Sequence, residues 1–404
     1  MSSNHLPKDY RSERDEIPKP NVERISTRLV AVPKSEQYVA ESVFNPKDIM
    51  SLATSAKRII GDELGTLSPQ FFLNSIPQEG SFPRVVVVRR AGAVIGLFYA
   101  KELKLAGFRT GLICGDASDG PIIACKPEEQ EAVWSSALSH LLTFKTVLGI
   151  RLAIPYTEYE LYAGERIVSP IGAVASYREY STNAMLALPS SYEALLSQMG
   201  SHTRRNFRYY RRQFETQGHA YVEPLTIPEF RTATRELIGK SSIPAKSKRV
   251  EIDVRMCLAA DRPMLIGLRS NSGEWLATLG GWYVRDQATV RFQMNRDQEH
   301  RADSLSVVLR GYLIESLIRR GFQSIVFIRG VGEPLKRYCR NVPTVILYLD
   351  KPNRFLRPAR FLELAARLAP PSLAFKAVWL AKTNLKETPT PSAQLNDPFD
   401  PTLQ

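Results

Sequence analysis

The segment from Ser197 to Gly218, SQMGSHTRRNFRYYRRQFETQG, interleaves arginines with aromatic residues. Apolar side chains in and just before this segment recur at helical spacing, with Thr203 filling one gap: Leu196, Met199, Phe207, Tyr210 and Phe214. Ser201 is the expected N-cap residue, and Gly218 is expected just beyond the C-terminal end. The pattern therefore predicts a helix with one packed face and one strongly cationic face.

The cationic face of this predicted helix carries five arginines: Arg204, Arg205, Arg208, Arg211 and Arg212. A planar guanidinium group binds phosphate through two hydrogen bonds, so this face suits a ligand that carries phosphate. The alternative is a solvated helix face whose arginines pair with scattered carboxylates, which is what most charge runs are.

The overall composition indicates a soluble globular protein, because 44% of the 404 residues are hydrophobic and 24% are charged. This length is sufficient for two domains of ordinary size. The net charge of +13 predicts attraction to anions: nucleic acid, an anionic membrane surface or a phosphorylated ligand. The N-terminal residues have no apolar region typical of a signal peptide, and no long apolar run follows, so we expect a cytoplasmic protein without a transmembrane span.

The cysteine and histidine residues have no spacing typical of a metal site. Four cysteines are scattered without a C-x-x-C pair, and the five histidines form no H-x-x-x-H pair. We therefore expect reduced thiols and no bound metal. The chain also lacks a G-x-x-x-x-G-K-[ST] phosphate loop and a G-x-S-x-G nucleophile elbow.

The same order of predicted elements occurs twice, offset by roughly 175 residues. Each copy has a hairpin of two strands, a helix, a glycine that ends the helix and a final strand. In the first copy these features lie at residues 84–101, 127–148, 149 and 150–156. In the second copy they lie at residues 263–284, with a further strand at 288–295, and then at 303–320, 321 and 322–330. The repeat predicts a duplicated α/β unit.

The repeat and the flanking composition divide the chain into five parts. We expect an N-terminal domain at residues 26–182 and a C-terminal domain at 183–350. Tails rich in polar residues and proline, 1–25 and 387–404, are expected to be disordered. Residues 351–386 predict basic amphipathic helices, which either lie on an anionic membrane or pack back onto the second domain.

Three segments of the second half resemble the GNAT acyltransferase superfamily. They are most similar to the branch of cellulose-biosynthesis-type acetyltransferases, which is related to the FemAB transferases with two GNAT-like domains. The helix from Arg204 resembles that branch's R-R-N-x-R-R signature, the region 289–320 is similar to its acyl-CoA segment, and 327–339 is similar to its D-F-x-x-G-x-x-x-Y-K ending. The resemblance covers about 185–345. It implies an α/β (α+β) fold of two tandem GNAT-like domains, each a mixed, mostly antiparallel sheet flanked by helices, plus the C-terminal helices.

The resemblance also implies a function. We expect direct transfer of an acyl group, with acetyl as the first candidate, from acyl-CoA to an amine or hydroxyl of a small or sugar-type acceptor. A free strand edge would pair with the pantetheine arm, and the helix that follows would meet the pyrophosphate at its N-terminus, with Asp303 or Ser304 as N-cap. The implied cofactor-binding residues are Phe292, Gln293, Met294, Asn295, Arg301, Asp303 and Ser304. The implied phosphate- or substrate-binding residues are Arg204, Arg205, Arg208 and Arg212.

The implied catalytic residues lie mainly in the ending segment. Lys336 matches the family's lysine and would stabilise the transition state, Glu333 or Glu299 would act as base, and Tyr338 would give a proton to the leaving thiolate. The chain departs from the family pattern at three places. Residues 300–306 contain no glycine, where most members have a glycine-rich pyrophosphate loop. The expected Asp and Tyr of the ending are also replaced, the latter by Leu335.

Two functions from other classes remain open on the sequence. Arginines interleaved with Phe207, Tyr209 and Tyr210 are also typical of a nucleic-acid binder, although most of these aromatic residues fall on the packed stripe and we expect no specific nucleic acid. A membrane-surface scaffold with a degenerate GNAT fold is the other alternative, supported by the basic helices at 351–386.

Overall fold

The computed structural model describes residues 38–61, 64–77, 80–105, 108–117, 122–156, 174–241, 247–300 and 304–350. The strands are β1 (Tyr38–Val43), β2 (Ser81–Arg90), β3 (Ala93–Leu105), β4 (Phe108–Asp116), β5 (Ile123–Cys125), β6 (Gly149–Pro155), β7 (Val174–Ala187), β8 (Ala220–Val222), β9 (Pro263–Arg269), β10 (Trp275–Val284), β11 (Gln287–Asn295), β12 (Ser324–Phe327) and β13 (Arg340–Asp350). The α-helices are α1 (Pro46–Ser51), α2 (Ala53–Ile60), α3 (Pro69–Ser75), α4 (Gln130–Thr143), α6 (Tyr192–Gln198), α7 (Ser201–Thr216), α8 (Ile227–Leu237), α9 (Ser247–Ala259) and α10 (Leu305–Arg319).

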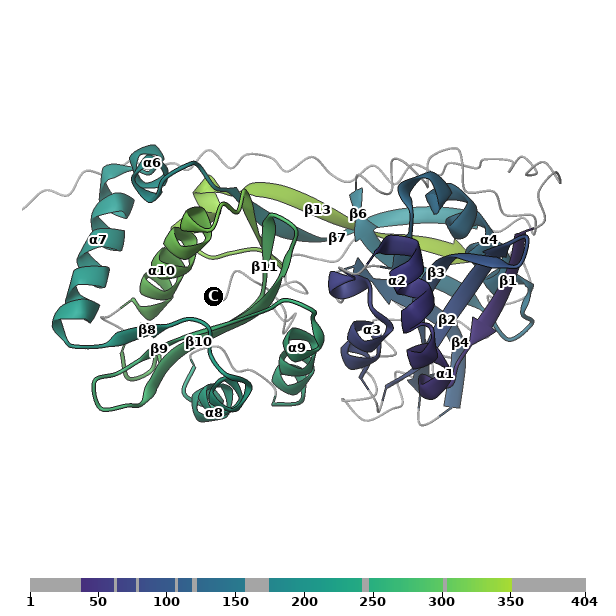
Figure 1. Ribbon diagram of the computed structural model, residues 1–404, viewed down its shortest axis with the longest axis horizontal. Coiled ribbons are helices and arrows are strands. Elements are labelled where there is room, and N and C mark those ends of the chain that lie inside the picture. The colour runs from purple at the N-terminus through teal and green to yellow at the C-terminus, as the bar shows by residue number, and fades with distance from the viewer. Residues whose placement is uncertain are drawn as a thin grey trace, which may run out of the picture.

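All described strands belong to one sheet that runs through two lobes (Figure 1). Its order is β1-β2-β3-β4-β6-β13-β7-β12-β11-β10-β9-β8, with β5 beside β3. In the first lobe the chain runs through β1, three helices, β2, β3, β4, α4 and β6. In the second it runs through β8, two helices, β9, β10, β11, α10 and β12. The repeat predicted from sequence is therefore present.

Each lobe has one parallel strand pair, β4 with β6 and β11 with β12, and the other pairs are antiparallel. The helices α4 and α10 connect the two parallel pairs, as a parallel connection requires. The predicted mixed, mostly antiparallel sheets flanked by helices are confirmed.

The two lobes exchange their last strands. β7 follows β6 in the chain but pairs with β12, whereas β13 follows β12 but pairs with β6. β7 and β13 also pair with each other, from Arg340 opposite Met185 to Asp350 opposite Val174. Figure 1 shows both strands running between the lobes. The boundary expected between residues 182 and 183 lies inside β7.

Helices cover both faces of the sheet in each lobe. In the second lobe, α7 and α10 pack on one face, where Phe207 and Phe214 join the apolar side of α10, and α8 and α9 pack on the other. In the first lobe, α4 covers one face and α1 to α3 cover the other. The lobes also touch through helices α3 and α9, and the ring of Phe71 lies edge-on to Trp282 with centroids 5.0 Å apart.

The predicted turns agree with the structure better than the predicted helix ends. Ala91 and Gly92 form the turn between β2 and β3, both with positive φ, and Gly321 follows α10 with a φ of 78°. Gly149, expected to end a helix, is instead the first residue of β6, because α4 stops at Thr143 where Phe144 adopts an extended conformation.

Three expected segments lie outside the described residues: the tails at 1–25 and 387–404 and the basic helices at 351–386. Among the helices that the structure does describe, none has the length and apolar character needed to cross a bilayer.

Candidate active site

Strand β11 contains a bulge at Arg291. Gly280 of β10 pairs with Phe292, but the next residue, Gly281, pairs with Val290, so Arg291 is an extra residue without a partner on β10. A Cβ atom on Gly281 would lie 1.9 Å from the carbonyl oxygen of Thr289, so only glycine permits this close approach.

An ion pair buried beneath helix α9 holds the bulged residue. The Arg291 Nε atom donates to Asp253 Oδ1 at 2.8 Å, and both side chains are nearly inaccessible to solvent. Arg249 reaches the other carboxylate oxygen of Asp253 at 3.4 Å. The bulge is therefore fixed by the helix that packs on it.

The bulge reverses which side chains of β11 face α10. Before it, Ala288 and Val290 pack in the core with α10. After it, Phe292 and Met294 pack with α8 and α9, and Gln293 contacts α10. Two of the predicted cofactor-binding residues, Phe292 and Met294, thus turn their side chains away from α10 and present only backbone groups at the strand edge.

Strands β11 and β12 diverge just beyond this bulge. They pair only from Gln287 opposite Ser324 to Val290 opposite Phe327. The last backbone bond between them runs from Ile328 N to Val290 O, at 3.1 Å. No strand in the described ranges pairs with that edge of Arg291–Asn295. We call the region between Arg291–Asn295 and Phe327 the wedge.

The first lobe differs at the corresponding place. There β4 and β6 pair from Leu112 opposite Gly149 to Asp116 opposite Ala153, so the pairing continues to the last residue of β4. The second lobe, and not the first, therefore has a parallel strand pair that opens while its first strand continues.

A buried arginine from α10 occupies the base of the wedge. Arg310 is 7% exposed, its Nε donates to Gln293 Oε1 at 2.9 Å, and its guanidinium carbon lies 5.9 Å from the ring centroid of Phe327. Gln293 Nε2 in turn donates to Asn295 Oδ1 at 2.8 Å. Burial lowers the pKa of Arg310 to about 10, although Cys339 and Asp297 act in the opposite direction.

Gln293 and Asn295 were among the site residues expected from sequence, whereas Arg310 was not. The available signal was a cation on an apolar helix, at helical spacing from the buried residues Leu313 and Ile314. A charged residue in such a position is seldom fully buried without a partner or a role.

The start of α10 differs from the expected phosphate-binding turn. Ser304 occupies the N-cap position, but its backbone is left-handed, with φ 45° and ψ 48°, and its side chain makes no capping hydrogen bond. Ser304 is thus the N-cap residue by position, one of the two expected alternatives, but its side chain does not cap the helix because its backbone is left-handed and not extended. Arg301 and Asp303 lie outside the described residues.

Glu299 lies in the turn after β11, where it forms an ion pair with Arg296. Its carboxylate accepts from the buried Arg296 at 3.1 Å, and Glu274 lies 3.4 Å from the same Arg296 nitrogen. A groove of about 350 Å³ adjoins this cluster and is lined by Glu236, Lys240, Ser272, Gly273, Glu274 and Arg296.

The other predicted catalytic residues lie on or beside the short 3₁₀ helix η5 (Leu335–Tyr338). Lys336 is exposed, and Glu333 is exposed with its carboxylate 3.1 Å from Arg337 Nε. Within the described part of the chain, neither hydrogen-bonds to Glu299. Glu333, Lys336 and Tyr338 thus lie on one short segment of the chain, whereas Glu299 is bound to Arg296 in the turn after β11.

Tyr338 joins η5 to the N-terminus of α7. Its Oη accepts from the Gly200 N–H at 3.0 Å. This bond and a side-chain hydrogen bond with Thr203 lower the pKa of Tyr338. The phenol therefore satisfies the backbone N–H of the N-cap residue Gly200, one of the donors that a helix start leaves without an intrahelical partner.

The arginine-rich segment forms the expected helix, which begins one residue earlier than predicted. Met199 is extended and Gly200 precedes the first turn, so Leu196 and Met199 belong to α6 and its end. Ser201 is the first helical residue and not the N-cap, a correction to the sequence expectation that follows from this break. Gly218 lies beyond the helix with a φ of 71°, as predicted.

The arginines of α7 divide into two groups. Arg208 pairs with Glu193, and Arg211 bridges Glu215 at 3.0 Å and Glu315 of α10 at 2.6 Å. The other three form no hydrogen bond or ion pair with any described residue: Arg204, Arg205 and Arg212. The solvated-face alternative thus accounts for two arginines and leaves three available to a ligand.

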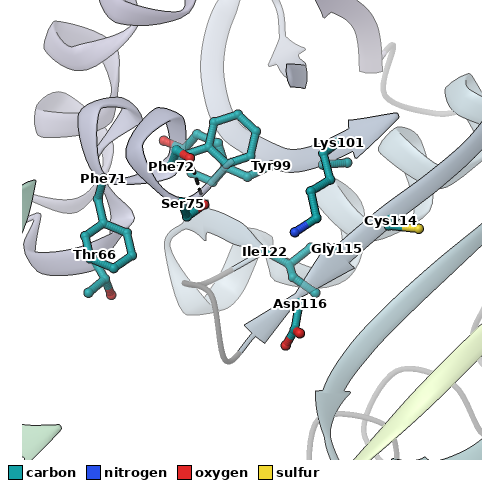
Figure 2. A pocket seen from close by; sticks show the side chains of 11 residues that line it. Thr66, Phe71, Phe72, Ser75, Tyr99, Lys101, Cys114, Gly115, Asp116 and Ile122 are labelled. Carbon is teal, nitrogen blue, oxygen red and sulfur yellow. Dashed lines mark hydrogen bonds between the residues drawn. The ribbon is translucent and has the colours of Figure 1, made fainter. Parts of the chain in front are cut away.

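The first lobe contains a small cavity between β3, β4 and α3 (Figure 2). Figure 2 shows Phe72 and Tyr99 on one side of it and Lys101 and Asp116 on the other. Its volume of about 20 Å³ has room for about one water molecule. Burial raises the pKa of Cys114 at its edge to about 11, so this thiol is not activated.

Among the described residues, no group of three or more His, Cys, Asp or Glu side chains is placed to hold a metal ion. The four cysteines form no disulfide.

No family model and no curated protein matches this chain. Solved structures do resemble it. A tandem GNAT protein from the clavulanic acid biosynthesis pathway is 10% identical with a TM-score of 0.41, covering 79% of this chain and 99% of that one. FemX is 9% identical with a TM-score of 0.47, covering 71% and 88%. The C-terminal domain of a putative lysylphosphatidylglycerol synthetase from Agrobacterium fabrum is 10% identical with a TM-score of 0.47, covering 75% and 92%.

At these identities the likeness concerns the fold and does not extend to activity. The topology itself supports the assignment of the fold. Each lobe has five strands in order, and its fourth and fifth strands are parallel and joined by a helix. The chain has a tandem GNAT-like fold.

Proposed function

We propose that the second lobe transfers an acyl group from an acyl-CoA thioester, acetyl-CoA first among them, directly to an amine or hydroxyl. The observation that carries this proposal is the wedge. Its free edge on Arg291–Asn295 leaves backbone N–H and C=O groups without a strand partner in the described residues. An extended chain that carries amides can pair with such an edge as an added strand does, and pantetheine is a chain of this kind.

The chemistry needs a nucleophile, a base and stabilisation of charge. The amine or hydroxyl of the acceptor attacks the thioester carbonyl carbon, the C–S bond breaks, and the proton lost by the acceptor ends on the CoA sulfur. We assign Lys336 to stabilise the transition state and Glu333 or Glu299 to serve as base. Tyr338, whose pKa is lowered, is assigned to return the proton to the thiolate.

We assign the free arginines of α7 to phosphate recognition. Arg204, Arg205 and Arg212 have no ion-pair partner among the described residues, and Arg208 would join them by leaving Glu193. The phosphate belongs either to a nucleotide-linked sugar acceptor or to the 3′-phosphate of CoA. The proposed setting is the cytoplasm, with contact to an anionic membrane through the basic residues 351–386.

Calorimetry of the full chain with CoA and with acetyl-CoA tests the proposal, followed by release of the CoA thiol in the presence of pooled amine and hydroxyl acceptors. We expect binding and acceptor-dependent thiol release. Lys336→Ala should keep the fold, since Lys336 is exposed, and lower turnover by about tenfold or more. Arg319→Ala is the matched control, because it removes an exposed cation at the C-terminal end of α10 that has no ion-pair partner among the described residues, and should change turnover less than about twofold.

Two results would contradict this function. Failure of both CoA and acetyl-CoA to bind, together with no thiol release, would remove it. Salt-dependent retention on DNA without CoA binding would favour the nucleic-acid reading instead. Full turnover in Lys336→Ala would remove only Lys336 from the mechanism.

A further inference from the structure

Arg310 is a buried cation without a counter-ion among the described residues. Within the described part of the chain, its hydrogen-bond partner is the neutral amide of Gln293, and no carboxylate there lies within ion-pair distance. The other buried arginines of this lobe differ: Arg291 pairs with Asp253, and Arg296 pairs with Glu274 and Glu299.

A buried charge with a neutral partner is unfavourable for folding. Transferring an unpaired ion from water into a protein interior costs several kcal/mol, and an apolar side chain of similar size is often as stable or more stable there. The surroundings of Arg310 on α10 are apolar, because Leu313 and Ile314, three and four residues further along the helix, are buried in the core. Packing therefore gives no reason for a guanidinium at this position.

The position of Arg310 indicates that it would contact the thioester end of a bound acyl-CoA. Arg310 lies at the base of the wedge, where Phe327 ends β12 and Gln293 continues β11. The charged and bulky nucleotide end of CoA cannot enter a gap between two strands, whereas the thin pantetheine arm can. The thioester, at the far end of that arm, would therefore come closest to the base.

We propose that the Arg310 guanidinium stabilises the negative charge that forms on the thioester carbonyl oxygen; this inference rests on the proposed function. As the acceptor attacks the carbonyl carbon, the C=O π electrons move to oxygen and the guanidinium donates hydrogen bonds to that oxyanion. The electron pair then returns to re-form C=O while the C–S bond breaks, and the acceptor's proton ends on sulfur. Arg310 itself gains and loses no proton.

Gln293 positions the guanidinium for this role. Its carbonyl oxygen accepts from Arg310 Nε, which leaves the outer nitrogens of Arg310 to face the ligand, and its amide group is in turn fixed on Asn295. This chain of contacts depends on the bulge at Arg291, which turns Gln293 toward α10.

A pair of CoA thioethers tests the inference by binding alone. S-carboxymethyl-CoA carries a carboxylate near the position of the thioester oxygen, and S-carbamoylmethyl-CoA is its neutral counterpart of almost equal size. Calorimetry on the full chain should find the charged analogue bound about tenfold or more tightly. In Arg310→Met this ratio should fall to about one, in Arg310→Lys it should be partly kept, and in Arg319→Met, an exposed site on the same helix, it should be unchanged.

Turnover of acetyl-CoA supplies a second readout. Arg310→Met should lower kcat about 100-fold with little change in KM, as loss of one oxyanion donor does. Its melting temperature should stay at or above that of the wild type, because a buried charge has been removed.

The wild-type protein alone can overturn the inference, whether or not Arg310→Met folds. If it binds both analogues equally, Arg310 does not meet the reacting oxygen, although acyl transfer itself would stand. If it binds neither analogue nor CoA, the proposed function fails together with this inference.

Discussion

The side chains around each arginine of α7 decide what that arginine can bind. Arg211 is half-buried between α7 and α10 and is held by two glutamates, so its charge serves the helix packing. Arg204 and Arg205 lie one helical turn from the N-terminus of α7 without an ion-pair partner in the described residues. Tyr338 hydrogen-bonds within the same turn, at Gly200 and Thr203. A phosphate bound here would lie next to η5.

Arg204→Ala combined with Arg205→Ala should therefore weaken one phosphate ligand by about tenfold or more, because two charge-assisted contacts are lost. Calorimetry with CoA and with UDP-N-acetylglucosamine identifies which ligand it is. The matched control is Arg231→Ala combined with Arg235→Ala, which removes two exposed arginines of α8. Equal affinities for both ligands in both double variants would return α7 to the role of a solvated helix face.

Individual residues were predictable from sequence where a local rule applied. Phe207 and Phe214 are buried at helical spacing, and Gly218 has the positive φ of a residue beyond a helix end. Arg310 was not predictable in this way, because its role depends on the bulge at Arg291. That bulge arises from the pairing of β11 with β10. The sequence feature associated with it is the Gly280-Gly281 pair, which does not by itself predict a bulge in the next strand.

The elements α7 and α10 are joined by a polar network at the edge of their apolar contact. Glu215 accepts from Tyr312 Oη at 2.7 Å and from Arg211 Nε at 3.0 Å, and Arg211 continues to Glu315. The bond from Tyr312, together with Arg211 and Arg212, lowers the pKa of Glu215 below its ordinary 4.5. The network should therefore respond to acid.

The sign of this response follows from the lowered pKa. A carboxylate whose folded pKa lies below its unfolded value stabilises the fold fully above the unfolded value, and the contribution disappears as pH falls through the folded pKa. Glu215→Gln should cost about 0.5 to 1 kcal/mol of unfolding free energy at neutral pH and less at about pH 3.5.

Urea unfolding of wild type and Glu215→Gln at the two pH values measures this difference. Glu251→Gln is the control, an exposed glutamate on α9 with no ion-pair partner among the described residues, and it should differ little from wild type at either pH. A difference for Glu215→Gln that is the same at both pH values would show that the carboxylate charge does not stabilise the α7–α10 contact.

Elements were predicted well where the pattern is local and poorly at their ends. The hairpins at Ala91-Gly92 and at 271–273 follow from turn residues between apolar runs. The start of α7 was misplaced by one residue because Gly200, and not Ser201, is its N-cap, whereas α10 starts after Ser304 as expected but without a side-chain cap. The N–H of Gly200 is bound by Tyr338 of η5, a contact with a distant segment that the local sequence does not contain.

At the scale of the whole molecule, the repeat was readable from sequence but the strand exchange was not. β7 and β13 are both long strands in equivalent places of the two copies, and local pattern cannot tell which fifth strand each one pairs with. The exchange places the C-terminal strand in the core of the first lobe. There Val345, Leu347 and Leu349 pack with residues of β2, β4 and α4.

Because of this exchange, a substitution in the core of β13 should destabilise the first lobe, which the chain forms before residue 156. Leu347 is 1% exposed and pairs with Leu152 of β6, so Leu347→Ala leaves a cavity in the first lobe and should cost about 2 to 5 kcal/mol. Hydrogen exchange should lose protection most in β4 and β6, about 200 residues earlier in the chain. Leu317→Ala in α10, fully buried in the second lobe, is the matched control and should lower protection mainly in β10 to β12. If Leu347→Ala instead weakened only the strands after residue 174, β13 would not support the first lobe. The two copies would then be independent units joined by a linker, because the β7–β13 pairing would carry no stability from one lobe to the other.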